Sequence, residues 1–150
     1  MMEKLEILNH VKGALSARIA EAEAELASLR ASQRTDTKSS AGDKHETSRA
    51  MAQLEIERQL ERISGARSLL DLAGKVVLDR ACDEVGFGNL VKTSEGLYFL
   101  AVGFGRVELD TTSTCYCISM QSPIGSALKG LAVGAAFEFQ GRSVRIESIE

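Results

Sequence analysis

Residues 35–43 read Thr35-Asp-Thr-Lys-Ser-Ser-Ala-Gly-Asp43, a polar and small-residue stretch in a chain of 150 residues. Clusters of such turn-forming residues separate elements and do not continue them. The segments on both sides are long, and their apolar residues recur at helical spacing. A short connection between two helices folds the second back on the first, so the sequence predicts an antiparallel helical hairpin.

Apolar residues on both sides of this break recur mostly in steps of three and four, the spacing of a coiled-coil seam. Before the break they are Leu8, Val11, Leu15, Ile19, Ala22, Leu26 and Leu29. After it they are Met51, Ile56, Leu60, Ile63, Leu70 and Ala73, and Gly74 is a reasonable helix stop. We predict a coiled-coil hairpin domain over residues 1–74. A coiled coil that pairs two copies of the chain is the alternative.

After Gly74 the pattern changes to short alternating segments, which are typical of strands. We predict strands over 75–80, 89–93, 97–102, 106–109, 114–119, 136–139 and 143–149. Before the last two strands, Ser122 is placed to cap a short helix, with Pro123 at its first position and Gly130 at its end. The predicted class is therefore α+β, with a small antiparallel sheet domain over 75–150 that carries one short helix.

Composition limits the functional classes. The formal net charge is −3, so bulk electrostatics does not favour nucleic-acid binding by the whole chain. The chain has neither a long apolar run nor a signal-peptide pattern, and a cytoplasmic location is expected. The three cysteines imply no disulfide framework. Cys115 and Cys117 share one side of a predicted strand, and buried free thiols are expected there rather than zinc ligands.

Asp43 and Glu46 open the second predicted helix, at the far end of the hairpin. Carboxylates three residues apart share a helix face and could jointly offer oxygen ligands to Mg²⁺. Two ligands alone hold such an ion poorly, so a partner would have to complete the site. The alternative is purely structural, because Asp43 at the N-cap and Glu46 reaching back to it would form a capping box.

Basic residues surround this acidic pair. Arg30, Arg34 and Lys38 step by four, which makes a ridge if the first helix persists to Lys38, and Lys44 and Arg49 lie across the break. Such a ridge could contact RNA or DNA phosphates; an ordinary solvated face is the alternative. His45, between the two carboxylates, could act as an acid or base, but a solvated loop residue is the favoured interpretation.

Two segments, residues 42–47 at the start of the second predicted helix and residues 118–125 around the start of the predicted short helix, together resemble the Gre-type transcript-cleavage factors of bacterial RNA polymerase. Gly42-Asp43-Lys44-His45-Glu46-Thr47 is similar to the family's Gly-Asp-Leu-Lys-Glu-Asn. Ile118-Ser119-Met120-Gln121-Ser122-Pro123-Ile124-Gly125, continuing through Leu128, Lys129-Gly130 and Val133-Gly134, resembles its C-terminal signature. The two segments occur in the family's order, hairpin first and sheet domain second.

The resemblance implies a function as well as a fold. The sheet domain would be FKBP-like and would dock on RNA polymerase through Ser122, Pro123, Ile124 and Gly125. The hairpin would enter the polymerase's secondary channel as part of a monomeric factor. Asp43 and Glu46 would then help to retain a shared Mg²⁺ while the polymerase cuts the RNA 3′ end of a backtracked complex. The protein would be an accessory factor, not an enzyme by itself, with no membrane and no sequence-specific DNA contact.

The sequence also departs from the family. Ser48-Arg49-Ala50 replaces the family's usual Ala-Glu-Tyr after the acidic pair, which removes an aromatic ring and reverses a charge. These departures keep an alternative open, in which the protein binds the channel and inhibits or modulates transcription without cleavage. A separate competing class is a coiled-coil adaptor, whose helices pair two copies and whose sheet domain binds a peptide.

Overall fold

The computed structural model describes residues 2–36, 42–80, 82–110 and 113–150, with the side chains of residues 2, 36 and 42–45 also left out. The chain divides into two compact units. One is helical, Ala14–Leu70; the other joins the chain up to Gly13 with Asp71–Glu150. This division differs from the predicted limits of 1–74 and 75–150, because the first turns of the N-terminal helix belong to the sheet unit.

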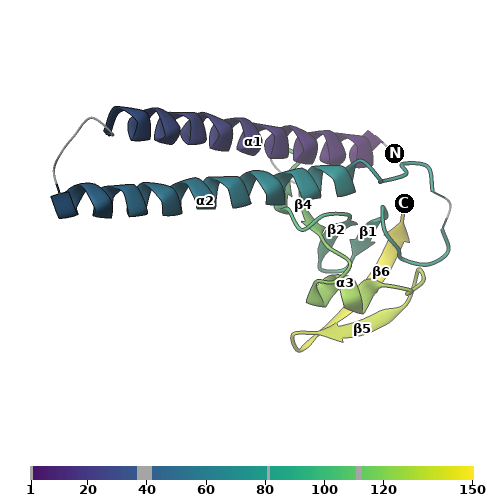
Figure 1. Ribbon diagram of the computed structural model, residues 1–150. Helices are drawn as coiled ribbons and strands as arrows, with labels where there is room; N and C mark the ends of the chain where they lie inside the picture. The colour runs from purple at the N-terminus through teal and green to yellow at the C-terminus, as the bar shows by residue number, and fades with distance from the viewer. Residues whose placement is uncertain (1, 37–41, 81, 111–112) are drawn as a thin grey trace. The chain divides into compact units, whose positions relative to one another are not determined.

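The helical unit comprises most of two long helices, α1 (Met2–Asp36) and α2 (Gly42–Ala73), that lie antiparallel and side by side (Figure 1). Within it, Ala22 and Leu26 of α1 pack with Ile56 and Ile63 of α2. An ion pair of 2.7 Å between Glu23 Oε1 and Arg67 Nη2 joins the same two helices. The predicted helical pair is therefore confirmed, and its apolar seam is filled by residues of one chain.

The seam on α2 differs from the predicted one. Met51 and Leu60 are 65% and 43% exposed, so their assignment to the seam was wrong. Two other residues are buried in their place. Gln59 lies between Ile56 and Ile63 in the sequence, and Ala66 follows Ile63 by three residues. Leu60 follows Gln59 by one residue and is rotated about 100° away from the seam. The buried Gln59 amide is satisfied, since its Nε2 donates to Glu55 Oε1 at 2.8 Å and its Oε1 accepts from Arg62 Nη1 at 3.2 Å.

Besides the start of α1, the described residues of the sheet unit form six strands and one short helix, and the α+β class is confirmed. In spatial order the strands are β3-β4-β2-β1-β6-β5. Their bounds are β1 Leu90–Thr93, β2 Gly96–Leu100, β3 Gly105–Glu108, β4 Thr114–Ile118, β5 Ala136–Phe139 and β6 Arg142–Ile149, with α3 at Pro123–Leu128. The sheet is mixed and not wholly antiparallel as predicted. Strand β4 lies between β3 and β2, and it pairs antiparallel with β3 and parallel with β2.

The predicted strand over 75–80 was wrong, because that segment forms turns that leave α2. The amides of Lys75 and Val76 donate to Leu72 O and Ala73 O, at 3.0 and 3.3 Å, so this backbone closes the helix end. Val77 is 56% exposed, so its side chain is not packed on a face of the sheet. Leu78 O instead accepts a 3.0 Å hydrogen bond from the buried Lys4 Nζ. Burial lowers the pKa of that lysine.

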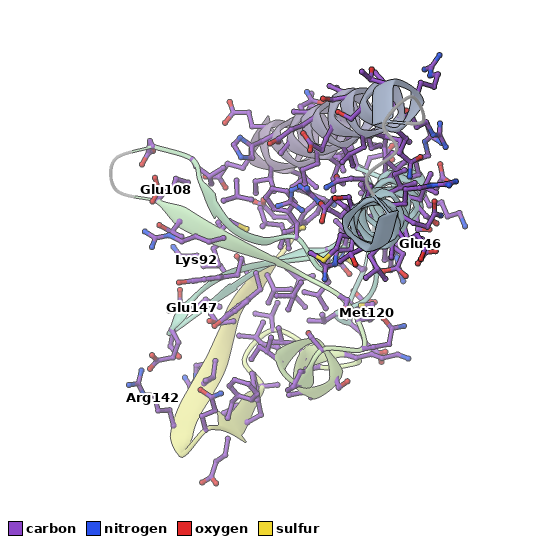
Figure 2. All side chains as sticks on the ribbon, turned by 60° about the vertical axis from the view of Figure 1, so that its left-hand side comes forward. Glu46, Lys92, Glu108, Met120, Arg142 and Glu147 are labelled. Carbon is purple, nitrogen blue, oxygen red and sulfur yellow. The ribbon has the colours of Figure 1, made fainter. Side chains whose placement is uncertain are left out.

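Two apolar layers lie on the two faces of the sheet. On one face, Val91, Leu100 and Ile146 pack with Leu128 of α3, and Figure 2 shows side chains filling the space between α3 and the strands. On the other face, strand register places Phe99 beside Cys117 and Val107 beside Cys115. Both thiols are buried, as predicted, and burial raises the pKa of Cys115 to about 12.

Candidate functional site

The acidic pair lies in the first turns of α2, which begins at Gly42. Glu46 is exposed, near the end of the helix (Figure 2). It makes no hydrogen bond or ion pair with any residue that the structure describes. The side chains of Asp43, Lys44 and His45, and the whole of Lys38, lie outside the described residues. The capping alternative for Asp43 therefore stays a prediction, while Glu46 presents its carboxylate to solvent.

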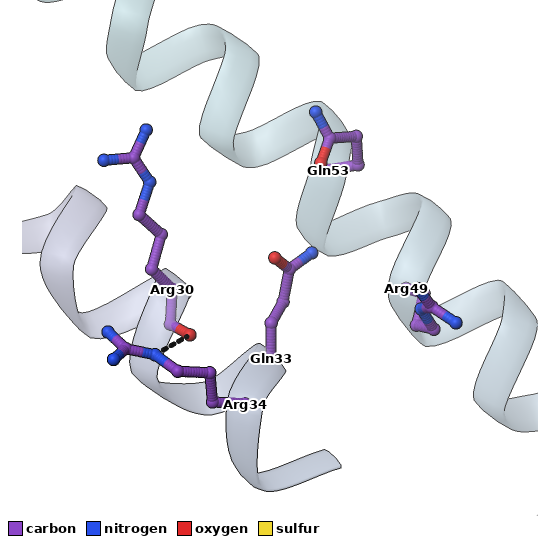
Figure 3. Close-up of a pocket in the computed structure, with 5 residues that line it drawn as sticks. All are labelled: Arg30, Gln33, Arg34, Arg49 and Gln53. Carbon is purple, nitrogen blue, oxygen red and sulfur yellow. Dashed lines mark hydrogen bonds between the residues drawn. The ribbon is translucent and has the colours of Figure 1, made fainter. Parts of the chain in front are cut away.

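Three of the five predicted basic residues line one hollow in the helical unit (Figure 3). Its volume is about 490 Å³, and we call it the arginine hollow; its lining residues are Arg30, Gln33, Arg34, Arg49 and Gln53. Figure 3 shows Arg30 and Gln33 extending from α1 toward α2. The two glutamines were missed by the sequence analysis. Their spacing was available, since Gln33 is three residues from Arg30 and Gln53 is four from Arg49, but a neutral amide gives no charge signal.

The arginine hollow is cationic, because three guanidinium groups and no carboxylate line it among the described residues. Arg34 Nε donates to the backbone oxygen of Arg30 at 3.5 Å, one turn earlier on α1. Arg30 and Arg49 take part in none of the ion pairs formed within the described part of the chain. Guanidinium groups bind phosphate oxygens through paired N–H donors. The arrangement is suited to a phosphate-bearing ligand.

Opposite charges are therefore adjacent on α2. Glu46 comes three residues before Arg49, so the two side chains project from neighbouring turns on the same side of the helix. A carboxylate can ligate a hard cation, and the arginines can hold phosphate groups. Both kinds of group can contribute to chemistry on a phosphodiester, so this end of the helical pair is the candidate functional site.

The metal-binding capacity of the site is partial. Asp43 and Glu46 supply the hard oxygen donors that suit Mg²⁺, and Glu46 is accessible. Among the residues that the structure describes, no group of three or more His, Cys, Asp or Glu side chains could hold an ion. Carboxylate oxygens are of the donor type that suits Mg²⁺, and metal binding by Asp43 and Glu46 stays a prediction.

The predicted docking residues have structural roles in the sheet unit. Ser122 is the N-cap of α3, and its Oγ accepts from Gly125 N at 3.0 Å and donates to Ser119 O at 2.7 Å. Gly125 is buried, and Ile124 packs on the core around Leu128. Pro123 is exposed. The sequence signature is thus explained by the geometry of α3, and a docking role for these residues stays a prediction.

Comparison with known proteins finds similarity to a solved structure, but no family model and no curated protein. No family model matches the chain, and no curated protein matches it. The chain is similar to a solved structure described as that of the transcription factor Gfh1, with 21% identity over 92% of each chain and a TM-score of 0.36. Among the described residues, no helix is both long and apolar enough to span a membrane. At that TM-score the functional proposal has to rest on this chain's own residues.

Proposed function

We propose that this protein acts on RNA polymerase as an accessory transcription factor, and that the end of its helical pair reaches the polymerase's reaction centre. The observation that carries the proposal is the exposed carboxylate of Glu46 beside the arginine hollow. The Gre-type resemblance of the same segment supports it. The partners are then RNA polymerase and the RNA 3′ end held inside it.

The helical pair has suitable dimensions for entering a channel. Helix α2 has 32 residues, which corresponds to roughly 48 Å at about 1.5 Å per residue. Two packed helices are narrow, and their seam is filled by apolar residues of the same chain. This leaves the charged end accessible and favours a monomer over a coiled coil made by two copies.

The finer proposal is stimulation of transcript cleavage. Asp43 and Glu46 would hold one side of a Mg²⁺ site that polymerase carboxylates complete. When bound, that ion would supply charge neutralisation at the scissile phosphate. Arg30, Arg34 and Arg49 would hold neighbouring RNA phosphates. Glu46 would also orient the attacking water by accepting a hydrogen bond from it. The protein contributes these groups to another enzyme's active site and is not an enzyme alone.

The test is RNA cleavage in backtracked elongation complexes supplied with Mg²⁺. Wild-type protein should release short 3′ RNA fragments. Asp43→Ala or Glu46→Ala should reduce the rate by roughly two or more powers of ten, because each removes an oxygen ligand that acts in the transition state. Equal cleavage by wild type and by the double variant would overturn the catalytic role.

A binding measurement separates cleavage from the alternatives. Polymerase affinity should be nearly unchanged in Asp43→Ala and Glu46→Ala, since docking is assigned to the sheet unit. Tight binding that slows transcription without releasing fragments would support the inhibitory alternative. Absence of polymerase binding, together with a dimer in sedimentation analysis, would support the adaptor alternative and contradict the proposal.

A further inference from the structure

We propose that the arginine hollow is a binding site for a small oligophosphate anion, meaning an anion that carries two or more linked phosphates. This goes beyond the proposed function, because it requires neither RNA polymerase nor the carboxylates Asp43 and Glu46. The proposal rests on the observation that Arg30, Arg34 and Arg49, which come from two helices, line one hollow.

The placement of the guanidinium groups favours several linked phosphates over a single one. Arg30 and Arg34 are one turn apart on α1, so their side chains project from neighbouring positions on one face. Arg49 lines the hollow from the other helix, α2, on which Figure 3 shows it. Three cations approaching from two helices match an anion whose negative charges are spread along its length. Each guanidinium presents a planar fork of donors for phosphate oxygens.

The hollow's size suits a small molecule. A volume of about 490 Å³ falls within the range of roughly 300–1,000 Å³ found for small-molecule sites. No aromatic residue lines it among the described residues, so stacking of a base is not a source of affinity. Phosphate contacts therefore have to supply most of the binding free energy, and binding should weaken as salt screens the charges.

Gln33 and Gln53 add a second kind of contact. Each primary amide carries a carbonyl acceptor and two N–H donors. The amides could hydrogen-bond a group attached to the phosphates, such as the sugar or base of a nucleotide. The same chemistry could come from a free nucleoside triphosphate or from inorganic triphosphate, and parallel titrations distinguish the two sources.

The experiment is titration calorimetry of the full chain with ATP, GTP and inorganic triphosphate at low salt, with sulfate as a reference anion. Oligophosphates should bind at least roughly tenfold more tightly than sulfate, because several charge-assisted contacts form at once. Arg30→Gln, Arg34→Gln and Arg49→Gln should each weaken oligophosphate binding by roughly tenfold. If the nucleoside triphosphates are the source, Gln33→Ala or Gln53→Ala will weaken their binding and leave inorganic triphosphate unaffected.

Arg58→Gln is the matched control. Arg58→Gln removes one positive charge from α2, the helix that carries Arg49. Arg58 pairs with Glu55 at 3.3 Å and does not line the hollow. Its affinity for oligophosphates should equal that of wild type, and circular dichroism should show equal helicity in all variants. If Arg58→Gln lost as much oligophosphate affinity as the three arginine-hollow variants, the proposal would be overturned, because net charge alone would explain the binding. Oligophosphate binding no tighter than sulfate would overturn it as well, as would binding of single-stranded RNA without any oligophosphate binding.

Discussion

Gly125 illustrates how one residue of the C-terminal signature is constrained by its surroundings. A Cβ atom at this position would lie 2.1 Å from Ser119 O and 2.8 Å from Ser122 Oγ. Ser119 O also accepts the hydrogen bond from the N-cap hydroxyl of Ser122. No side chain can therefore be added without moving the turn that starts α3.

We predict that Gly125→Ala destabilises the sheet unit by roughly 2–3 kcal/mol, the upper part of the range for overpacking a tight site. Urea denaturation followed by tyrosine fluorescence would measure it, because Tyr98 and Tyr116 lie in that unit. Gly103→Ala is the control, since the nearest atom to its added Cβ is Ser119 Cβ at 3.9 Å. A stability loss in Gly125→Ala no larger than in Gly103→Ala would contradict the packing argument.

The buried thiols should make the free energy of unfolding depend on pH. Burial raises the pKa of Cys115 to about 12, from an ordinary value of 9.0, and it raises the pKa of Cys117 as well. The folded state then keeps thiol protons that the unfolded state releases, so their contribution is complete below pH 9 and is lost as pH rises toward 12. We expect the free energy of unfolding to fall over this alkaline range, as measured by urea titrations at each pH. In a Cys115→Ala, Cys117→Ala variant the fall should be smaller; an identical fall would contradict this cause.

At the scale of elements, two apolar residues of α2 that look alike in the sequence differ in burial. Ile63 is 6% exposed and packs against α1, whereas Leu60 is 43% exposed. Ile63→Ala should destabilise the helical pair by about 2–4 kcal/mol, because it leaves a cavity in the seam. Leu60→Ala should change stability by less than about 1 kcal/mol. Thermal unfolding followed by helicity would measure both, and a larger loss in Leu60→Ala would contradict the assigned seam.

The elements show what the sequence could predict. The helical pair followed from the 35–43 break and the clear repeat of α1, and α3 followed from Ser122 and Pro123. The seam of α2 could not be predicted in the same way, because Gln59 is polar and gives no apolar signal. Its burial is explained by its hydrogen bonds with Glu55 and Arg62, which the sequence does not show. The parallel β2–β4 pair also depends on where a hairpin inserts, which periodicity does not report.

The candidate site was predictable in part for related reasons. Charge and spacing identified Arg30, Arg34 and Arg49, which the fold brings together. Gln33 and Gln53 became apparent only when packing placed them between the arginines. The docking role of the signature around Ser122 stays a prediction, and the structure gives Ser122 and Gly125 roles in forming α3.

At the scale of the whole molecule, the residues proposed for the reaction and those proposed for docking lie in different units. The helical unit carries Glu46 and the arginine hollow, and the sheet unit carries the signature assigned to docking. Changes at the acidic pair should therefore alter the reaction inside the polymerase complex without altering formation of that complex. Glu46→Gln is the sharpest change, because it keeps the size of the side chain while it removes the charge and replaces one oxygen with an amide nitrogen.

The most direct measurement is the rate of 3′ RNA release from backtracked elongation complexes at saturating factor and fixed Mg²⁺, for wild type, Glu46→Gln and Arg58→Gln. The account predicts that Glu46→Gln slows release by roughly tenfold or more, equivalent to at least about 1.4 kcal/mol of barrier, and that Arg58→Gln releases RNA at the wild-type rate. Release by Glu46→Gln at the wild-type rate would contradict the claim that this carboxylate takes part in the reaction.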